Sequence, residues 1–299
     1  AQAVLAQAPR APGGSPRMAS SEAIRRYREL LAEKEALARS IAWLRSQLPA
    51  EPDACAPTGS DLLFLADYAC KERHISVRGL ASPAVAEAAP VELTVQQRME
   101  KMSAVVWPSS CVLAEVVACE LRDICQGGAP VLELGCGTAL PSLVAAALGA
   151  EALATDAEVA AAELVIARNQ GAITLGSVTT ACLRWGDSVP ERPWGAVLAS
   201  DCIYDEGGHV PLAATLASVA GAALAGGSQK RVRILVAYQD RRPEVEQRFL
   251  LDRLREVGLQ ASELRLDAVP LSEKLRSCVH VVDVVPLALV AEAVESIHL

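Results

Sequence analysis

Aromatic residues are scarce in this chain of 299 residues, at 3% of the composition with only two Phe. So few rings argue against a platform on which nucleic-acid bases stack. Apolar residues still reach 52%, which excludes global disorder and leaves Leu, Val and Ala to fill the core. Such a core suits helices packed on a parallel sheet.

Residues that bind metals or form disulfides are few or badly spaced. The chain has four His and nine Cys, and no C-x-x-C occurs. An odd number of scattered Cys in a chain of this length indicates reduced thiols inside a cell. We therefore expect no metal site, structural zinc included, and a cytoplasmic location, with the nucleus or an organelle as alternatives.

Charge is unevenly distributed along the chain. Residues 1–50 hold eight Lys or Arg against four Asp or Glu, which is +4, so the rest carries −12 and the whole chain −8. The acidic main part argues against nonspecific binding of DNA or RNA. Residues 207–229 lack charged side chains but are too rich in Ala, Gly, Ser and Thr for a membrane span, and they predict a small-residue helix on a sheet. We expect a monomer that binds neither nucleic acid nor membrane.

Three parts can be separated along the chain. Residues 1–21 contain no Asp or Glu and are rich in Ala, Pro, Gly and Ser, which predicts disorder, with a transit peptide as the alternative. Residues 22–100 are expected to form a helical extension, and residues 101–299 the main domain. Within the extension we predict helices over 22–48 and 62–70, a strand over 74–80 and a loop over 83–90.

Strands alternate with helices after Trp107, which predicts an α/β fold: a doubly wound, Rossmann-like, seven-stranded sheet with helices on both faces. The last two strands have no good helix between them, so an antiparallel pair is expected there. The predicted strands are 131–134, 152–155, 178–183, 196–200, 232–238, 259–266 and 278–287, and the predicted helices are 109–125, 140–148, 158–169, 210–224 and 243–257.

A glycine turn follows the first of these strands. Gly135, Cys136 and Gly137 form a G-x-G between an apolar strand and a helix, and glycines let the backbone turn sharply and approach a ligand. Asp156 ends the next strand, 21 residues after Gly135, where an acid can bind both ribose hydroxyls of an adenosine cofactor. Together they predict an adenosine-type site, although G-x-G alone also fits an ordinary strand-to-helix turn.

The same residues narrow the choice of cofactor. The nicotinamide fingerprint G-x-G-x-x-G is broken at Leu140, and no G-K-[ST] occurs, which disfavours ATP and GTP. Glu133, two residues before the turn, would repel a pyrophosphate but suits a sulfonium. S-adenosylmethionine fits best, and a nicotinamide oxidoreductase is the distant alternative.

Five motifs in order resemble the seven-β-strand (class I) S-adenosylmethionine-dependent protein methyltransferases, most of which methylate lysine. The resemblance covers roughly residues 105–290 and implies that Trp107, Gly135 to Gly137, Asp156, Trp185 and Ser200 surround the cofactor. The motifs are Val106-Trp107-Pro108-Ser109-Ser110, Glu133 to Thr138 (E-L-G-C-G-T), Asp156, Leu183-Arg184-Trp185-Gly186 and Ala199-Ser200-Asp201-Cys202-Ile203-Tyr204.

Two subgroups of that family are similar to different parts of the chain. Residues 73–78 and 182–185 resemble members that methylate lysine in calmodulin, whereas 139–141, 198–201 and 238–239 resemble members that methylate arginine. The expected function is therefore methylation of a protein substrate on lysine, with calmodulin as one candidate. The alternatives are an arginine, histidine or small-molecule acceptor, and a cofactor-binding module without catalysis.

Asp201 and Tyr204 are the catalytic candidates. They follow the strand 196–200 at the edge of the sheet where open α/β folds bind ligands. Asp201 can orient a lysine ammonium through a charge-assisted hydrogen bond, and Tyr204 can wall the lysine channel. The alternative is that Asp201 caps the next turn and Tyr204 packs. Arg241 and Arg242, after the strand 232–238, are interpreted as a solvated turn, with contact to the substrate as the alternative.

Overall fold

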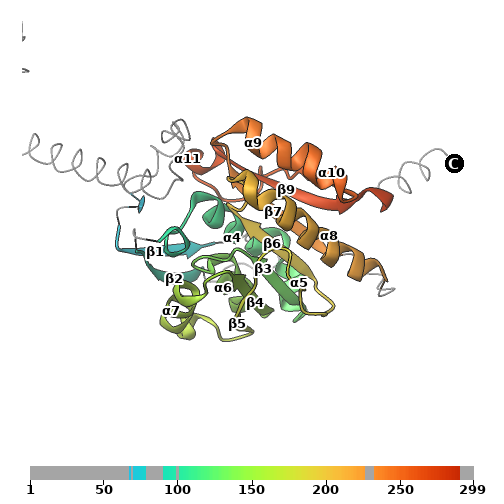
Figure 1. Ribbon diagram of the computed structural model, residues 1–299. Helices are drawn as coiled ribbons and strands as arrows, with labels where there is room; N and C mark the ends of the chain where they lie inside the picture. Colours follow the sequence, from blue (N-terminus) through green and yellow to red (C-terminus); the bar gives the residue numbers. More distant parts are fainter. Residues whose placement is uncertain (1–66, 69, 79–89, 99–100, 226–231, 290–299) are drawn as a thin grey trace, which may run out of the picture.

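The computed structural model describes residues 67–68, 70–78, 90–98, 101–225 and 232–289 (Figure 1). The predicted disordered segment 1–21 and the predicted helix 22–48 lie outside the described residues, as does most of 62–70.

Two strands are present in the part of the chain assigned to a helical extension. β1 (Glu72–Val77) and β2 (Val91–Gln96) pair antiparallel in a sheet of their own. β1 confirms the strand expected over 74–80, with a shifted start, but β2 was missed. It is only six residues long and begins directly after Pro90, which ends the predicted loop. With two buried side chains, Leu93 and Val95, the alternation of buried and exposed positions is too short to predict a strand. The part assigned to a helical extension therefore contains one strand that was predicted and one that was not.

The main sheet has seven strands in the order β5-β4-β3-β6-β7-β9-β8. The first five are parallel, and β9 runs antiparallel to both β7 and β8. All seven predicted strands and the terminal antiparallel pair are confirmed. Their bounds are β3 (Pro130–Leu134), β4 (Glu151–Asp156), β5 (Ser177–Cys182), β6 (Ala196–Ser200), β7 (Arg233–Gln239), β8 (Leu259–Glu263) and β9 (Val279–Pro286).

Helices cover both faces of this sheet (Figure 1), and a separate apolar core lies under each set. Side chains of β3 alternate between the cores, since Val131 belongs to one and Leu132 and Leu134 to the other. The doubly wound α/β fold is therefore confirmed. One face carries α4 (Pro108–Glu120), α5 (Arg122–Gln126), α6 (Leu140–Ala147) and α7 (Ala160–Arg168); the other carries α8 (His209–Ala225), α9 (Pro243–Gln247), a π-helical turn (Arg248–Arg253) and α10 (Leu254–Glu256).

Short helical segments complete the described chain. The helix α11 (Glu273–Arg276) lies between β8 and β9, where no helix was expected, and is capped by the Ser272 side chain. At four residues it is too short to give a periodic pattern. The 3-10 turns are Met102–Ala104, Gln170–Ala172 and Glu206–Gly208.

The uncharged helix α8 packs on the sheet. Leu212, Leu216 and Val219 are buried in the core that it shares with β3 and β6. The segment Glu206–Ala225 is long and apolar enough to span a membrane by length and composition alone, a test that core helices also pass. The prediction of a small-residue helix lying on a sheet is confirmed.

The strand order changes direction beside β3. From β3 the chain proceeds outward through β4 and β5 on one side, and then through β6 and β7 on the other. Open α/β sheets bind ligands beyond the carboxyl ends of the strands at such a point. The residues that follow β3, β4, β6 and β7 are therefore the ones to inspect.

Candidate functional site

The turn after β3 requires its glycines. Gly135 has φ +63° and Gly137 has φ +51°, a region that L side chains rarely adopt. A Cβ on Gly135 would lie 2.7 Å from Cys202 Sγ and 3.0 Å from Trp185 Cζ2. The backbone of this turn can therefore take its form only with glycine at position 135.

Asp156 lies beside the glycine turn. It is the last residue of β4, and the parallel register sets Leu134 of β3 opposite Thr155. The Gly137 N–H donates a hydrogen bond to Asp156 Oδ2 at 2.9 Å. The structure thus brings together the two features from which the sequence predicted an adenosine site.

Trp185 and two cysteines pack around this turn. The Trp185 ring is so close to Gly208 that a Cβ there would come within 2.8 Å of it. Cys202 Sγ donates to the carbonyl oxygen of Leu134 at 3.4 Å. Burial raises the pKa of the Cys136 and Cys202 thiols well above the ordinary value. Both stay protonated, which agrees with small space-filling residues and not with nucleophiles.

Glu133 is an internal group. Its side chain is fully buried, and Oε2 accepts hydrogen bonds from the backbone N–H and the hydroxyl of Ser142, at 3.0 and 2.5 Å. Oε1 has no partner, and burial raises the pKa of Glu133 to about 8. The prediction of a charged carboxylate that repels pyrophosphate is wrong, because the side chain points under α6 and carries a proton near neutral pH.

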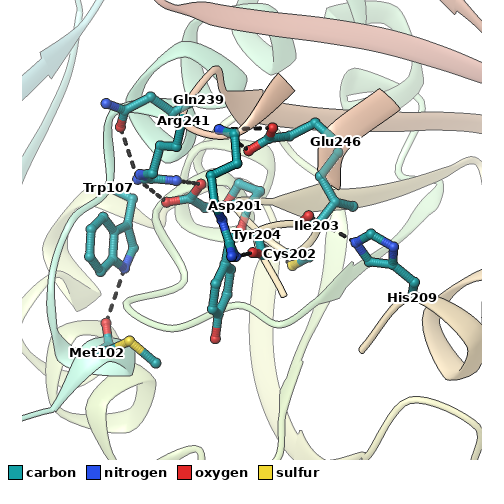
Figure 2. Close-up of polar contacts among 12 residues, drawn as sticks. Met102, Trp107, Asp201, Cys202, Ile203, Tyr204, His209, Gln239, Arg241 and Glu246 are labelled. Carbon is teal, nitrogen blue, oxygen red and sulfur yellow. Dashed lines mark hydrogen bonds and ion pairs between the residues drawn. The ribbon is translucent and has the colours of Figure 1, made fainter. Parts of the chain in front are cut away.

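The reactive end is built around an ion pair. Both carboxylate oxygens of Asp201 accept hydrogen bonds from the Arg241 guanidinium, at 2.5 and 2.8 Å (Figure 2). The two side chains are 7% and 13% exposed. The alternative in which Asp201 caps the next turn is wrong, and so is the interpretation of Arg241 as part of a solvated turn. Adjacent parallel strands β6 and β7 bring these residues together, a pairing that local sequence does not reveal.

Trp107 lies at the same end of the site. Its indole N–H donates to the carbonyl oxygen of Met102 at 3.1 Å. The Arg241 guanidinium carbon lies 5.1 Å from the centre of the Trp107 ring, within the range of a cation–π interaction. The Tyr68 ring is 5.2 Å away on an inclined plane. The structure therefore joins Trp107 to the Asp201 pair.

Tyr204 and Ser200 follow the same strand. The Tyr204 side chain is 38% exposed, and its ring extends away from the Asp201–Arg241 pair (Figure 2). Burial, with Cys202 and Asp201 nearby, raises the pKa of Tyr204 to about 12, so the hydroxyl is neutral at physiological pH. Ser200 ends β6 and is 8% exposed.

Three polar residues near the site were not among the predicted site residues. Gln239, fully buried at the end of β7, accepts from Arg241 at 2.9 Å. Arg242 donates to the Tyr204 carbonyl oxygen. For Gln239, the available signal in the sequence was a polar residue at the end of an apolar strand. His209 begins α8, and its Nε2 lies 3.0 Å from the Ile203 carbonyl oxygen.

No group of three or more His, Cys, Asp or Glu is placed to hold a metal ion in the described parts of the chain. None of the eight cysteines in these parts of the chain forms a disulfide.

A protein-family model covers the part of the chain that contains these residues. A family model described as lysine methyltransferase matches residues 87–256. The chain belongs to this family. The match includes the glycine turn, Asp156, and the Asp201–Tyr204 segment, so the resemblance inferred from the motifs is confirmed at the level of the family.

Curated relatives of the lysine methyltransferase family cover part of the chain. "Protein N-lysine methyltransferase METTL21A" of Xenopus tropicalis is 32% identical over 119 residues, which are 39% of this chain and 54% of the relative. The protein of the same name from Danio rerio is 35% identical over 111 residues, which are 35% of this chain and 50% of the relative. The chain thus spans about half the length of the curated relatives it matches.

Among solved structures, the CcbJ methyltransferase from Streptomyces caelestis is 13% identical with a TM-score of 0.43, covering 62% of this chain and 92% of that one. The glycopeptide N-methyltransferase MtfA with S-adenosyl-L-methionine is 15% identical with a TM-score of 0.41, covering 56% and 86%.

The residues at the β3 and β4 ends fit S-adenosylmethionine. The turn has no room for a Cβ at Gly135, and the Asp156 carboxylate lies beside it. Glu133 Oε1 is a buried polar atom without a partner in the structure. In the protonated form that burial favours, this atom is a donor, which an acceptor on a bound molecule or an ordered water can satisfy.

Proposed function

We propose that the chain transfers a methyl group from S-adenosylmethionine to a lysine side chain of a protein. The observation that carries the proposal is that the family match includes both ends of the site, and that these ends follow the adjacent strands β4, β3 and β6. When bound, S-adenosylmethionine supplies a methyl group already activated by its sulfonium.

The glycine turn and Asp156 bind the cofactor in this proposal. The turn at Gly135–Gly137 offers backbone close to the ligand, and the carboxylate of Asp156 accepts hydrogen bonds from ribose hydroxyls. Trp185 and Ser200 wall the pocket. Most of the rate acceleration then comes from alignment of the acceptor nitrogen with the methyl group, because the leaving group needs no further activation.

Asp201 orients the acceptor nitrogen. A carboxylate offers about four acceptor positions, of which the Arg241 guanidinium takes one on each oxygen. A lysine nitrogen needs only one of the remaining positions, whereas an arginine acceptor would compete with Arg241 for the two-oxygen fork. This geometry favours lysine over arginine, which is the second candidate acceptor.

Tyr204 contributes a neutral wall. Its raised pKa of about 12 keeps the hydroxyl protonated, so it can donate or accept one hydrogen bond without adding charge beside the acceptor. We also propose that the chain acts as a monomer on a protein and binds neither nucleic acid nor a membrane. Calmodulin remains one candidate substrate.

Two measurements test the proposed function. Isothermal titration of the folded chain with S-adenosylmethionine should show binding, and NAD should bind more weakly or not at all. Labelled methyl transfer into a lysate of the source organism should then mark a protein band whose acid hydrolysate contains methyl-lysine. Binding of S-adenosylmethionine without any labelled band supports the non-catalytic module instead. If S-adenosylmethionine does not bind, the proposed enzymatic function is wrong.

A further inference from the structure

The segment after β7 contacts both ends of the turn that follows β6. The Arg241 guanidinium binds the Asp201 carboxylate through two hydrogen bonds. Its neighbour Arg242 donates to the carbonyl oxygen of Tyr204. Two consecutive arginines of the segment after β7 therefore hold the first and last residues of the D-x-x-Y sequence that follows β6.

Arg241 is itself fixed by its surroundings. One guanidinium nitrogen also donates to Gln239 Oε1 at 2.9 Å, and the Trp107 ring lies 5.1 Å from the guanidinium carbon. Gln239 is fully buried in β7, and Trp107 is anchored through its own hydrogen bond to Met102. Carboxylate, amide oxygen and aromatic ring thus restrict the guanidinium to one position.

Asp201 adopts a backbone conformation that needs such support. Its φ is +58°, in the left-handed region, which is strained for a residue other than glycine. Its N–H donates to the Ala237 carbonyl oxygen at 2.8 Å, which ties the turn to β7. A carboxylate that is 7% exposed would be an uncompensated charge without Arg241.

We propose that Arg241 is the positioning residue of the reactive end: it holds the Asp201 carboxylate so that its unused lone pairs orient the acceptor lysine. This inference rests on the proposed function. Because the pair carries no net charge, the lysine is oriented by hydrogen bonding and is not captured by a bare negative charge. A bidentate guanidinium fixes the plane of the carboxylate, which a lysine in its place could not do.

The ion pair is tested first without any substrate. Unfolding midpoints are measured for wild type, Asp201→Asn, Arg241→Met and the double variant. Coupling predicts that the double variant loses less than the sum of the single losses. A parallel cycle on the exposed pair Arg265–Asp267 should be additive with shifts near zero. Additive losses at Asp201 and Arg241 would overturn the proposal.

The positioning role is tested by methyl transfer. Initial rates of labelled-methyl incorporation are measured over a dilution series of the lysate for wild type, Arg241→Met and Arg241→Lys. We expect the methionine variant to lose about 100-fold in plateau rate and the lysine variant about 10-fold. The Kd for S-adenosylmethionine, from titration, should stay within about two-fold for both. Arg253→Met, which removes an exposed arginine paired with Glu256, serves as the matched control.

Each other outcome contradicts a different statement. A methionine variant as fast as wild type, or faster, overturns the positioning role; a faster one would show that Arg241 obstructs the acceptor. The positioning role is also overturned if the methionine and lysine variants have equal rates and each rate falls only in proportion to the amount of folded protein lost. Absence of labelling by wild type itself removes the proposed function, and the unfolding cycle then still decides whether the pair exists.

Discussion

The two ends of the site are built in different ways. At the β3–β4 end, backbone conformation dominates: two glycines with positive φ and one carboxylate that accepts from a backbone N–H. At the β6–β7 end, side chains dominate: Asp201, Arg241, Gln239 and Trp107 hold one another. The first arrangement suits a constant cofactor, whereas the second can be varied residue by residue for a particular acceptor.

The comparison predicts that variants at the two ends separate cofactor binding from turnover. The largest effect is expected for Asp201→Asn, which should lower turnover by about 10²–10³-fold while changing the Kd for S-adenosylmethionine by no more than about two-fold. Asn keeps the left-handed backbone available but removes the charge that Arg241 binds. The exposed Asp267→Asn is the control, and an equal loss of binding and turnover in Asp201→Asn would erase the distinction.

The next effect is expected for Gly135→Ala. The added Cβ meets Cys202 Sγ at 2.7 Å on a backbone with φ +63°, so the turn must shift. We expect affinity for S-adenosylmethionine to fall by about 100-fold, measured by titration. Gly128→Ala is matched to it, because Gly128 has φ +69° with no atom within 4 Å of the added Cβ. If both variants lost affinity equally, the loss would come from backbone strain at a positive φ and not from the contact of the new Cβ with Cys202.

Asp156→Asn should have a smaller effect on binding. Replacing a charged acceptor by a neutral one removes about 1.5–3 kcal/mol from hydrogen bonds to ribose hydroxyls, which is roughly 10–100-fold in Kd. Turnover at saturating cofactor should change little. The nearby exposed Glu158→Gln, which loses an ion pair to Lys101, should leave Kd unchanged. If Asp156→Asn instead lowered turnover at saturation, the carboxylate would belong to the reactive end.

The smallest effect concerns stability and not function. Burial raises the pKa of Glu133 from its ordinary value of 4.5 to about 8, so between these pH values the folded state binds more protons than the unfolded state. The free energy of unfolding therefore falls as pH rises through this window. Glu133→Gln should remove this fall, on the order of a few kcal/mol across the window. Chemical denaturation from pH 4.5 to 8.5 measures it.

The exposed Glu191→Gln should show the same fall with pH as wild type. Parallel curves for Glu133→Gln and wild type would mean that Glu133 is ionised in the folded protein. In that case a charged carboxylate beneath the glycine turn would again be available to a sulfonium.

The same contrast explains what the sequence could predict. The glycine turn and Asp156 are local features, since each lies at the end of an apolar strand whose length and flanking residues are readable. All seven strands of the main sheet were found for the same reason. Arg241 was misjudged because its partner lies 40 residues earlier in the chain, and only the pairing of β6 with β7 brings the two together.

Burial was the other property that the sequence did not reveal. Glu133 alternates with apolar residues on β3, but the pattern does not say that its face is closed by α6 and Ser142. His209 and Gln239 likewise become internal only through tertiary packing. β2 was missed because six residues between a loop and a turn give too little alternation to separate a strand from irregular chain.

The proposed reaction is methyl transfer from S-adenosylmethionine to a protein lysine, with Asp201 acting after the cofactor is bound. The most direct measurement is amino-acid analysis of the band that wild type labels in a lysate with labelled S-adenosylmethionine, run beside Asp201→Asn at saturating cofactor. We expect methyl-lysine from wild type and a loss of about 10²–10³-fold in label from the variant, which still binds cofactor. Methyl-arginine in the band, or full labelling by Asp201→Asn, would contradict it.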